Sequence, residues 1–177
     1  MQLEAKMRSL REMLLAPLPE RSVRTDSSIF VVYPPELEME FRSQLQKVLH
    51  VLEERGVSFR HIDLTTLPFE ALEARGLLPS AFTSEFEDYG ALKRGLARAV
   101  QDALKERIAR AAGEVPGGAV ILSCTSALYP VIKFGDVLKE LQQLPCRIVL
   151  AFPGCEEGGK LHFMNLRDGY NYLAVKI

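Results

Sequence analysis

The stretch from Gly117 to Pro130 constrains the fold of this chain more than any other. Two glycines precede an unbroken apolar run (119–122), which gives way abruptly to hydroxyls, a thiol and a Tyr129-Pro130 step. A short apolar run bounded by turn residues is typical of a strand buried on both faces, as in a parallel sheet. In open parallel sheets the functional residues lie at the carboxyl ends of the strands. The segment from Ser123 to Tyr129 is therefore the first candidate for a functional site.

Three other segments predict strands of the same sheet. Residues 29–33 and 147–152 are apolar and rich in β-branched or aromatic side chains, whereas residues 57–64 are more polar and suit a strand nearer an edge. Apolar side chains at helical spacing predict helices over residues 35–56, 67–78, 89–112 and 131–144.

This alternation predicts a three-layer α/β domain. We expect a mostly parallel sheet with helices on both faces, because right-handed crossovers place successive helices that way. Two last strands, over residues 161–166 and 172–177, are expected to form a C-terminal β-hairpin that turns at residues 167–169.

No linker divides the chain, so we expect a single α/β domain over residues 1–177. A helix over residues 1–16 comes first, a polar connector follows over 17–28, and the core spans 29–177. The helix carries an apolar stripe at heptad-like spacing, formed by Leu3, Met7, Leu10 and Leu14. Such a stripe packs on its own domain or on another chain, and packing within one chain is the more common arrangement.

Charge and composition argue against several classes of protein. With 47% apolar residues and a net charge of −1, the chain gives no general case for binding nucleic acid or a membrane surface. Its apolar runs are far shorter than the roughly 20 residues that span a bilayer. The three cysteines have no CxxC spacing and the three histidines are scattered, so we expect reduced thiols, a cytoplasmic location and no metal site.

Residues 154–160 match the pattern G-x-x-x-x-G-K and follow a predicted buried strand. A phosphate-binding loop also needs a Ser or Thr that holds magnesium and a helix N-terminus behind the loop. Here Leu161 replaces the hydroxyl, Glu156 and Glu157 stand where phosphate would lie, and the next residues alternate like a strand. We therefore interpret the segment as an acidic, hairpin-like connection and expect no nucleotide or other cofactor.

Polar side chains at predicted strand ends form a candidate ligand pocket. They are Tyr33, Asp63, Ser123, Thr125, Ser126 and Tyr129. Hydroxyls in this position suit a nucleophile or an anion, but no G-x-S-x-G elbow surrounds them and no histidine is suggestively placed. A helix cap, with Cys124 as a small buried thiol, is the simpler interpretation. Asp63 suits magnesium or ribose, although a carboxylate that caps Thr65 is more common. We therefore assign no catalytic residue and expect no enzyme.

A basic stripe runs along the predicted helix over residues 89–112, and Arg94, Arg98 and Lys105 are its proposed contact residues. Such a stripe is most often a solvated face. Its functional interpretation is docking to an acidic partner or to nucleic acid. No aromatic side chains interleave with the cations, which disfavours a platform for single-stranded nucleic acid.

Several short motifs occur along the chain in an order that is shared with a known family. They are Ile29–Tyr33, Pro34-Pro35-Glu36, Glu53-Glu54-Arg55-Gly56, Val120-Ile121-Leu122, Ala127-Leu128-Tyr129-Pro130, Phe152-Pro153-Gly154, Leu161-His162-Phe163-Met164 and Tyr170-Asn171-Tyr172. In this order the chain resembles the BrxB family of BREX bacteriophage-defence systems. The chain departs from the family in two places. The loop 123–126 lacks the usual glycines, and Lys133 and Leu173 stand near positions where the family commonly has arginine. These departures indicate a divergent member.

The resemblance implies a Rossmann- or P-loop-like α/β domain that lacks the nucleotide-binding motif. It also implies a cytoplasmic, non-enzymatic component of a multi-protein anti-phage system, acting as a protein-binding scaffold or adaptor. The partners it implies are other BREX proteins, above all the alkaline-phosphatase-superfamily protein PglZ, with nucleic acid bound only as part of the complex. Two alternatives remain open. One is binding of a nucleotide or small ligand in the strand-end pocket, and the other is binding of nucleic acid through residues 92–112.

Overall fold

The computed structural model describes residues 2–17, 28–79, 89–134, 137, 144–165 and 175–177. The strands are β1 (Ser28–Tyr33), β2 (Phe59–Asp63), β3 (Ala119–Ser123), β4 (Arg147–Glu157), β5 (Lys160–Phe163) and β6 (Val175–Lys176). Strands β1 and β3 are buried along their whole length, and β4 is buried until it emerges beyond Gly154. Strand β2 has partly exposed positions, in agreement with its more polar sequence.

The main sheet has the order β2-β3-β4-β1-β6, and all of these strands run parallel. Strand β5 pairs antiparallel with the outer end of β4. The predicted α/β class with a mostly parallel sheet is thereby confirmed. Because β2 is an edge strand with fewer neighbours, it tolerates polar residues that β1, β3 and β4 exclude.

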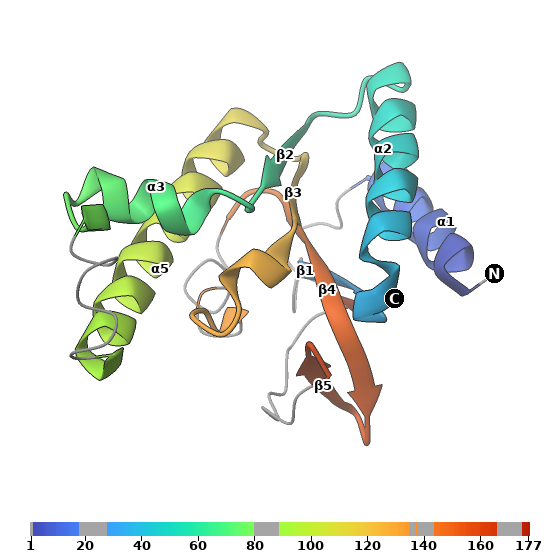
Figure 1. The fold of residues 1–177 in the computed structure, drawn as a ribbon. Helices are drawn as coiled ribbons and strands as arrows, with labels where there is room; N and C mark the ends of the chain where they lie inside the picture. The colour runs from blue at the N-terminus through green and yellow to red at the C-terminus, as the bar shows by residue number, and fades with distance from the viewer. Residues whose placement is uncertain (1, 18–27, 80–88, 135–136, 138–143, 166–174) are drawn as a thin grey trace.

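Helices cover both faces of this sheet (Figure 1). They are α1 (Gln2–Leu15), α2 (Glu38–Glu54), α3 (Leu67–Ala74) and α5 (Tyr89–Glu114). The core under α1 and α2 takes Ile29, Val31 and Tyr33 from β1, whereas the core under α3 and α5 takes Phe30 and Val32. Successive side chains of a strand point to opposite faces, so the fully apolar β1 contributes to both cores and joins the three predicted layers.

Two short 3-10 turns follow strands that end in the interior. Turn η2 (Pro35–Leu37) connects β1 to α2, and turn η3 (Thr125–Leu128) follows β3. Both turns lie at the carboxyl edge of the sheet, where polar residues of neighbouring strands converge.

Helix α1 packs on its own chain, beside α2. Its stripe residues Leu3, Met7, Leu10 and Leu14 are all buried. Arg147, at the start of β4, donates hydrogen bonds from Nη1 to the carbonyls of Met13 (2.6 Å) and Ala16 (2.8 Å), and from Nη2 to that of Pro17 (2.9 Å). The last carbonyls of a helix have no partner within the helix, so this guanidinium satisfies the end of α1 and attaches it to the sheet.

The C-terminal hairpin is formed by other strands than those predicted. The expected pairing of residues 161–166 with 172–177 is wrong, because β5 pairs with β4 and β6 lies parallel to β1. The actual turn is at Gly158 and Gly159, whose φ angles of 57° and 78° suit the two-residue turn of a hairpin. The segment 154–160 is therefore the hairpin-like connection that its acidic sequence predicted.

Two other predictions fall on parts of the chain outside the described ranges. The turn expected at residues 167–169 lies there, as does most of the helix expected over residues 131–144. None of the helices in the described ranges is both long and apolar enough to cross a membrane.

Candidate functional site

The sheet brings three of the predicted pocket residues together. Asp63 ends β2 and Ser123 ends β3, and the parallel register places the two side by side. Thr125 follows one turn later, in η3. Tyr33 ends β1, which β4 separates from β3, and it faces the layer of α1 and α2.

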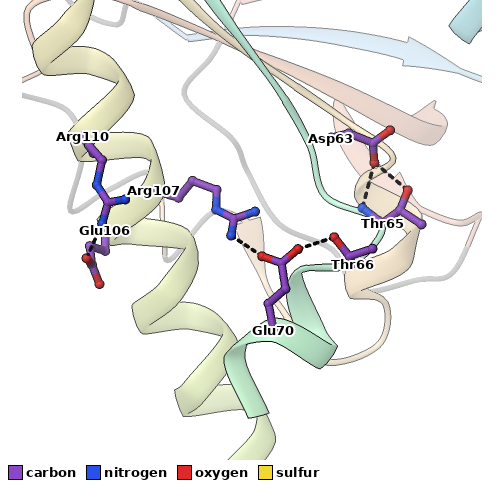
Figure 2. A network of polar contacts seen from close by, with 7 residues as sticks. All are labelled: Asp63, Thr65, Thr66, Glu70, Glu106, Arg107 and Arg110. Carbon is purple, nitrogen blue, oxygen red and sulfur yellow. Dashed lines mark hydrogen bonds and ion pairs between the residues drawn. The ribbon is translucent and has the colours of Figure 1, made fainter. Parts of the chain in front are cut away.

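Asp63 is bonded within the strand-end cluster on both of its oxygens. Its Oδ1 accepts hydrogen bonds from the backbone N–H of Thr65 (2.9 Å) and from the Thr65 hydroxyl (2.5 Å), as Figure 2 shows. Its Oδ2 accepts from Cys124 Sγ at 3.4 Å and lies 3.8 Å from Arg42 of α2. Burial alone would raise the pKa of Asp63, but the Thr65 and Cys124 hydrogen bonds and the Arg42 charge lower it below its ordinary value. The carboxylate therefore stays charged and caps Thr65, the more common role predicted for an aspartate in this position.

Cys124 is held as a thiol. It is buried, and it occupies the left-handed region with a φ of 56° at the junction of β3 and η3. Burial raises the pKa of its thiol, and the nearby Asp63 carboxylate acts in the same direction. A thiol with a raised pKa is a poor nucleophile at neutral pH.

Side chains near the start of α2 contact Tyr33. Its hydroxyl donates to Glu38 Oε2 at 2.6 Å, and its ring stacks on Phe41 with 4.1 Å between centroids. Burial and the Glu38 carboxylate raise the pKa of Tyr33 far above its ordinary value, so the phenol stays protonated. The second oxygen of Glu38, Oε1, is buried without a hydrogen-bond partner in the described part of the chain.

The remaining hydroxyls are divided between the interior and the surface. Ser123 Oγ lies 2.8 Å from His61 Nε2, and Thr125 donates to the carbonyl of Ala151 on β4 at 2.6 Å. Ser126 is half-buried in η3. Tyr129 is 39% exposed and its ring lies 6.1 Å from that of Phe163, so Tyr129 belongs to the β5 side of the sheet edge and not to the Asp63 cluster.

His61 is expected to make the protein less stable on mild acidification. Burial and the Arg42 charge lower its pKa below 6.5, although Asp63 opposes them. As the pH falls below 6.5, the unfolded chain binds a proton that the folded chain resists, so the free energy of unfolding decreases until the pH passes the folded pKa. Urea denaturation at pH 7.5 and 5.5 should show a smaller decrease for H61Q than for the wild type.

The control for this measurement is H50Q, which changes an exposed histidine that lies 3.4 Å from Glu54 on α2. This variant reports the effect of removing a histidine that lies away from the strand ends. Equal dependence in H61Q and the wild type would contradict the assignment to His61.

A phosphate-binding loop has no suitable place at the ends of β1 and β4. Such a loop presents successive backbone N–H groups to the ligand, ahead of a helix. After β1 the chain continues with Pro34 and Pro35, which have no N–H group, and Leu37 N–H already donates to the Pro34 carbonyl. After β4 no helix follows, because residues 154–160 form the β4–β5 hairpin.

A cavity of about 450 Å³ opens beyond the carboxyl end of β1. Of the predicted pocket residues, only Tyr33 lines it, together with Lys6 of α1, Gly154 and Cys155 of β4, and Lys176 of β6. Burial lowers the pKa of Lys6, against the influence of Glu156. Lys176 donates to Glu156 Oε1 at 2.8 Å. In the described part of the chain, no group of three or more His, Cys, Asp or Glu side chains is placed to hold a metal ion.

Glu38 and Arg42, which α2 places over the strand ends, were not predicted as site residues from the sequence. They are one helical turn apart at the start of the helix that follows β1. In an α/β fold, the first turn of a helix that follows a strand lies at the carboxyl edge of the sheet. Polar residues at i and i+4 in this turn could therefore have been predicted to lie near the site. Which strand they reach depends on the strand order, which the sequence did not reveal.

Two cations of α5 are paired with carboxylates. Arg107 binds Glu70, which also accepts from Thr66, while Arg110 binds Glu106 on the same helix (Figure 2). Asp102 of α5 pairs with Arg75 at 2.6 Å. Of the three proposed contact residues, Arg94 and Arg98 are exposed and Lys105 is half-buried. The α5 surface is therefore solvated at Arg94 and Arg98 and internally paired at Arg107 and Arg110.

Comparison with known protein families gives a match that covers two thirds of the chain. Residues 60–177 match a family model described as BREX protein BrxB. The chain belongs to the BrxB family. As a BrxB protein it is a component of BREX phage defence. No curated protein and no solved structure matches the chain. The family match includes Asp63, Ser123 and Thr125, whereas α1, β1 and α2 precede it.

Proposed function

We propose that this BrxB protein is a non-catalytic, protein-binding component of a cytoplasmic BREX complex, in which it acts as a scaffold or adaptor. The observation that carries the proposal is that the polar groups at the strand ends are hydrogen-bonded to other residues of the protein. Asp63, Ser123, Thr125 and Tyr33 each have a partner within the protein. Ser123, Thr125 and Tyr33 are also almost fully buried, with 2%, 0% and 1% of their surface exposed, whereas a nucleophile or general base must contact its substrate.

The chemistry of the neighbouring groups supports the same proposal. The Cys124 thiol has a raised pKa, and the chain after β1 offers proline in place of N–H donors. Membership of a multi-protein defence system makes other BREX proteins plausible partners. Among these we propose the alkaline-phosphatase-superfamily protein PglZ, with nucleic acid present only through the assembled complex.

Co-expression of the tagged chain with PglZ and the other proteins of its BREX system tests this function. We expect PglZ to elute with the chain as one species in size-exclusion chromatography. The proposal would be rejected if neither PglZ nor any other BREX protein associated with the chain.

A small ligand is the second candidate, and the cavity beside Tyr33 and Lys6 is the observation that favours it. Thermal-shift measurements with ATP, GTP and Mg²⁺ separate the two functions, because a ligand that binds only the folded state raises the melting temperature. The scaffold function predicts no shift. A shift of several degrees that K6A abolishes would assign a ligand to the cavity.

A further inference from the structure

The cavity of about 450 Å³ beyond the carboxyl end of β1 is lined by segments that lie far apart in the sequence. Helix α1 contributes Lys6, the outer part of β4 contributes Cys155 and Glu156, and β6 contributes Lys176. The volume is typical of small-molecule pockets, and ligands of open parallel sheets bind beyond the carboxyl ends of the strands. The cavity therefore has the position and the size of a small-ligand site.

Two ammonium groups of the cavity share a single carboxylate. Lys176 donates from Nζ to Glu156 Oε1 at 2.8 Å and to the Gly159 carbonyl at 2.9 Å. Lys6 is half-buried, and within the described chain its amine makes no hydrogen bond or ion pair, although the Glu156 charge acts on it. The lining residues thus carry two positive charges and one negative charge, so the cavity favours an anion.

Burial distinguishes Lys6 from the exposed cations of the chain. Arg94 and Arg98 of α5 are exposed to water, whereas burial lowers the pKa of Lys6 because its charged amine has lost part of its hydration. A partly desolvated ammonium gains more from a charged hydrogen-bond partner than a fully solvated one does. An anion in the cavity would supply this partner.

The other lining groups indicate the class of anion. Phosphate sites commonly use successive backbone N–H groups or arginine side chains, but Pro34 has no N–H group and the described lining includes no arginine. Leu37 and Ile177 also line the cavity, and both are half-buried, so part of each side chain is open to a ligand. A carboxylate joined to a small apolar body therefore fits this lining better than a phosphate does.

We propose that this cavity binds a small organic acid, whose carboxylate pairs with Lys6 and whose apolar body lies against Leu37 and Ile177. Lys176 keeps its bond to Glu156 and adds to the positive charge around the ligand. The inference rests on the cavity of the second candidate function and not on the adaptor function. Because the ligand is not a nucleotide, adaptor function and acid binding are compatible in one protein.

Isothermal titration calorimetry of the full chain with isovalerate tests the site. Isovaleramide keeps the shape of the acid without its charge, and inorganic phosphate has the charge without the apolar body, so isovalerate should bind most tightly of the three. K6M should weaken isovalerate binding at least about tenfold, because it keeps the apolar stem and removes the charged hydrogen bond. E156Q should strengthen binding, because it removes a like charge. K160M, which changes an exposed lysine outside the cavity, should bind like the wild type.

Alkylation of Cys155 locates the bound acid. Cys155 lines the cavity and is half-buried, whereas Cys124 and Cys146 are buried. Isovalerate should slow the labelling of Cys155 by iodoacetamide in the wild type, and the same concentration should protect K6M much less. Mass spectrometry of the labelled chain measures this rate, and circular dichroism verifies that each variant is folded.

Other outcomes overturn the proposal. If isovalerate does not bind, or if isovaleramide or phosphate binds as tightly, the cavity is not a site for an organic acid. If K6M binds isovalerate like the wild type, or if the acid leaves Cys155 labelling unchanged, the acid binds elsewhere. Association with PglZ, measured on the same preparations, reports the adaptor function separately, so failure of one function is distinguishable from failure of the other.

Discussion

Replacing Arg147 with alanine is expected to lower the free energy of unfolding by about 2–3 kcal/mol. The variant removes three hydrogen bonds from one charged donor to the carbonyls of Met13, Ala16 and Pro17. Each charge-assisted bond contributes more than a neutral one. The total loss of stability should be smaller than the sum of three charge-assisted hydrogen bonds, because these carbonyls lie near the surface and water can replace the guanidinium there.

Urea denaturation measures this loss, and R147K and R60A are its controls. A lysine keeps the charge, but its single ammonium cannot reach three carbonyls in the same fork, so R147K should lose most of the same stability. R60A breaks an exposed ion pair with Glu114 and should lose less than about 1 kcal/mol. Amide hydrogen exchange in α1 should accelerate in R147A and not in R60A. Unchanged exchange in R147A would show that the apolar stripe alone holds α1.

Much of the fold could be predicted because it depends on local patterns. The apolar run after Gly118 indicated a buried parallel strand, and the stripe of α1 indicated a packed helix. The hairpin was assigned to the wrong strands because Pro153-Gly154 looked like the end of β4. The strand continues because residues 160–163 pair with it, and this pairing depends on a partner that the local sequence does not specify.

The site was less predictable because its contacts join distant segments. The hydroxyls after β3 and the aspartate after β2 were found from their positions at strand ends. Their partners were not, since Arg42 reaches Asp63 only through the position of α2 over the sheet. Whether a given cation is paired was equally hard to predict from the sequence. Arg107 forms an ion pair with Glu70 of another helix, whereas Lys47 has no such neighbour in the described chain.

Replacing Gly154 with alanine should lower the free energy of unfolding by about 3 kcal/mol, the upper end of the usual range for overpacking. The structure explains this motif residue by packing and not by phosphate binding. A Cβ atom at this position would lie 2.1 Å from the backbone oxygen of His162 and 3.1 Å from the ring of Phe152. The obstacle is the backbone of β5, which cannot move without breaking its pairing with β4. Gly154 is therefore required for close packing of two strands and not for the approach of a phosphate.

The comparison with G158A makes this explanation testable by urea denaturation. Gly158 lies in the same hairpin with a φ of 57°, and a Cβ there meets no atom within 4 Å. Alanine at this position incurs only the cost of the left-handed conformation, about 1 kcal/mol. G154A should therefore lose clearly more stability than G158A, and added ATP and Mg²⁺ should change neither value. Equal losses in the two variants would mean that turn conformation, and not the contact with His162, explains the glycine at position 154.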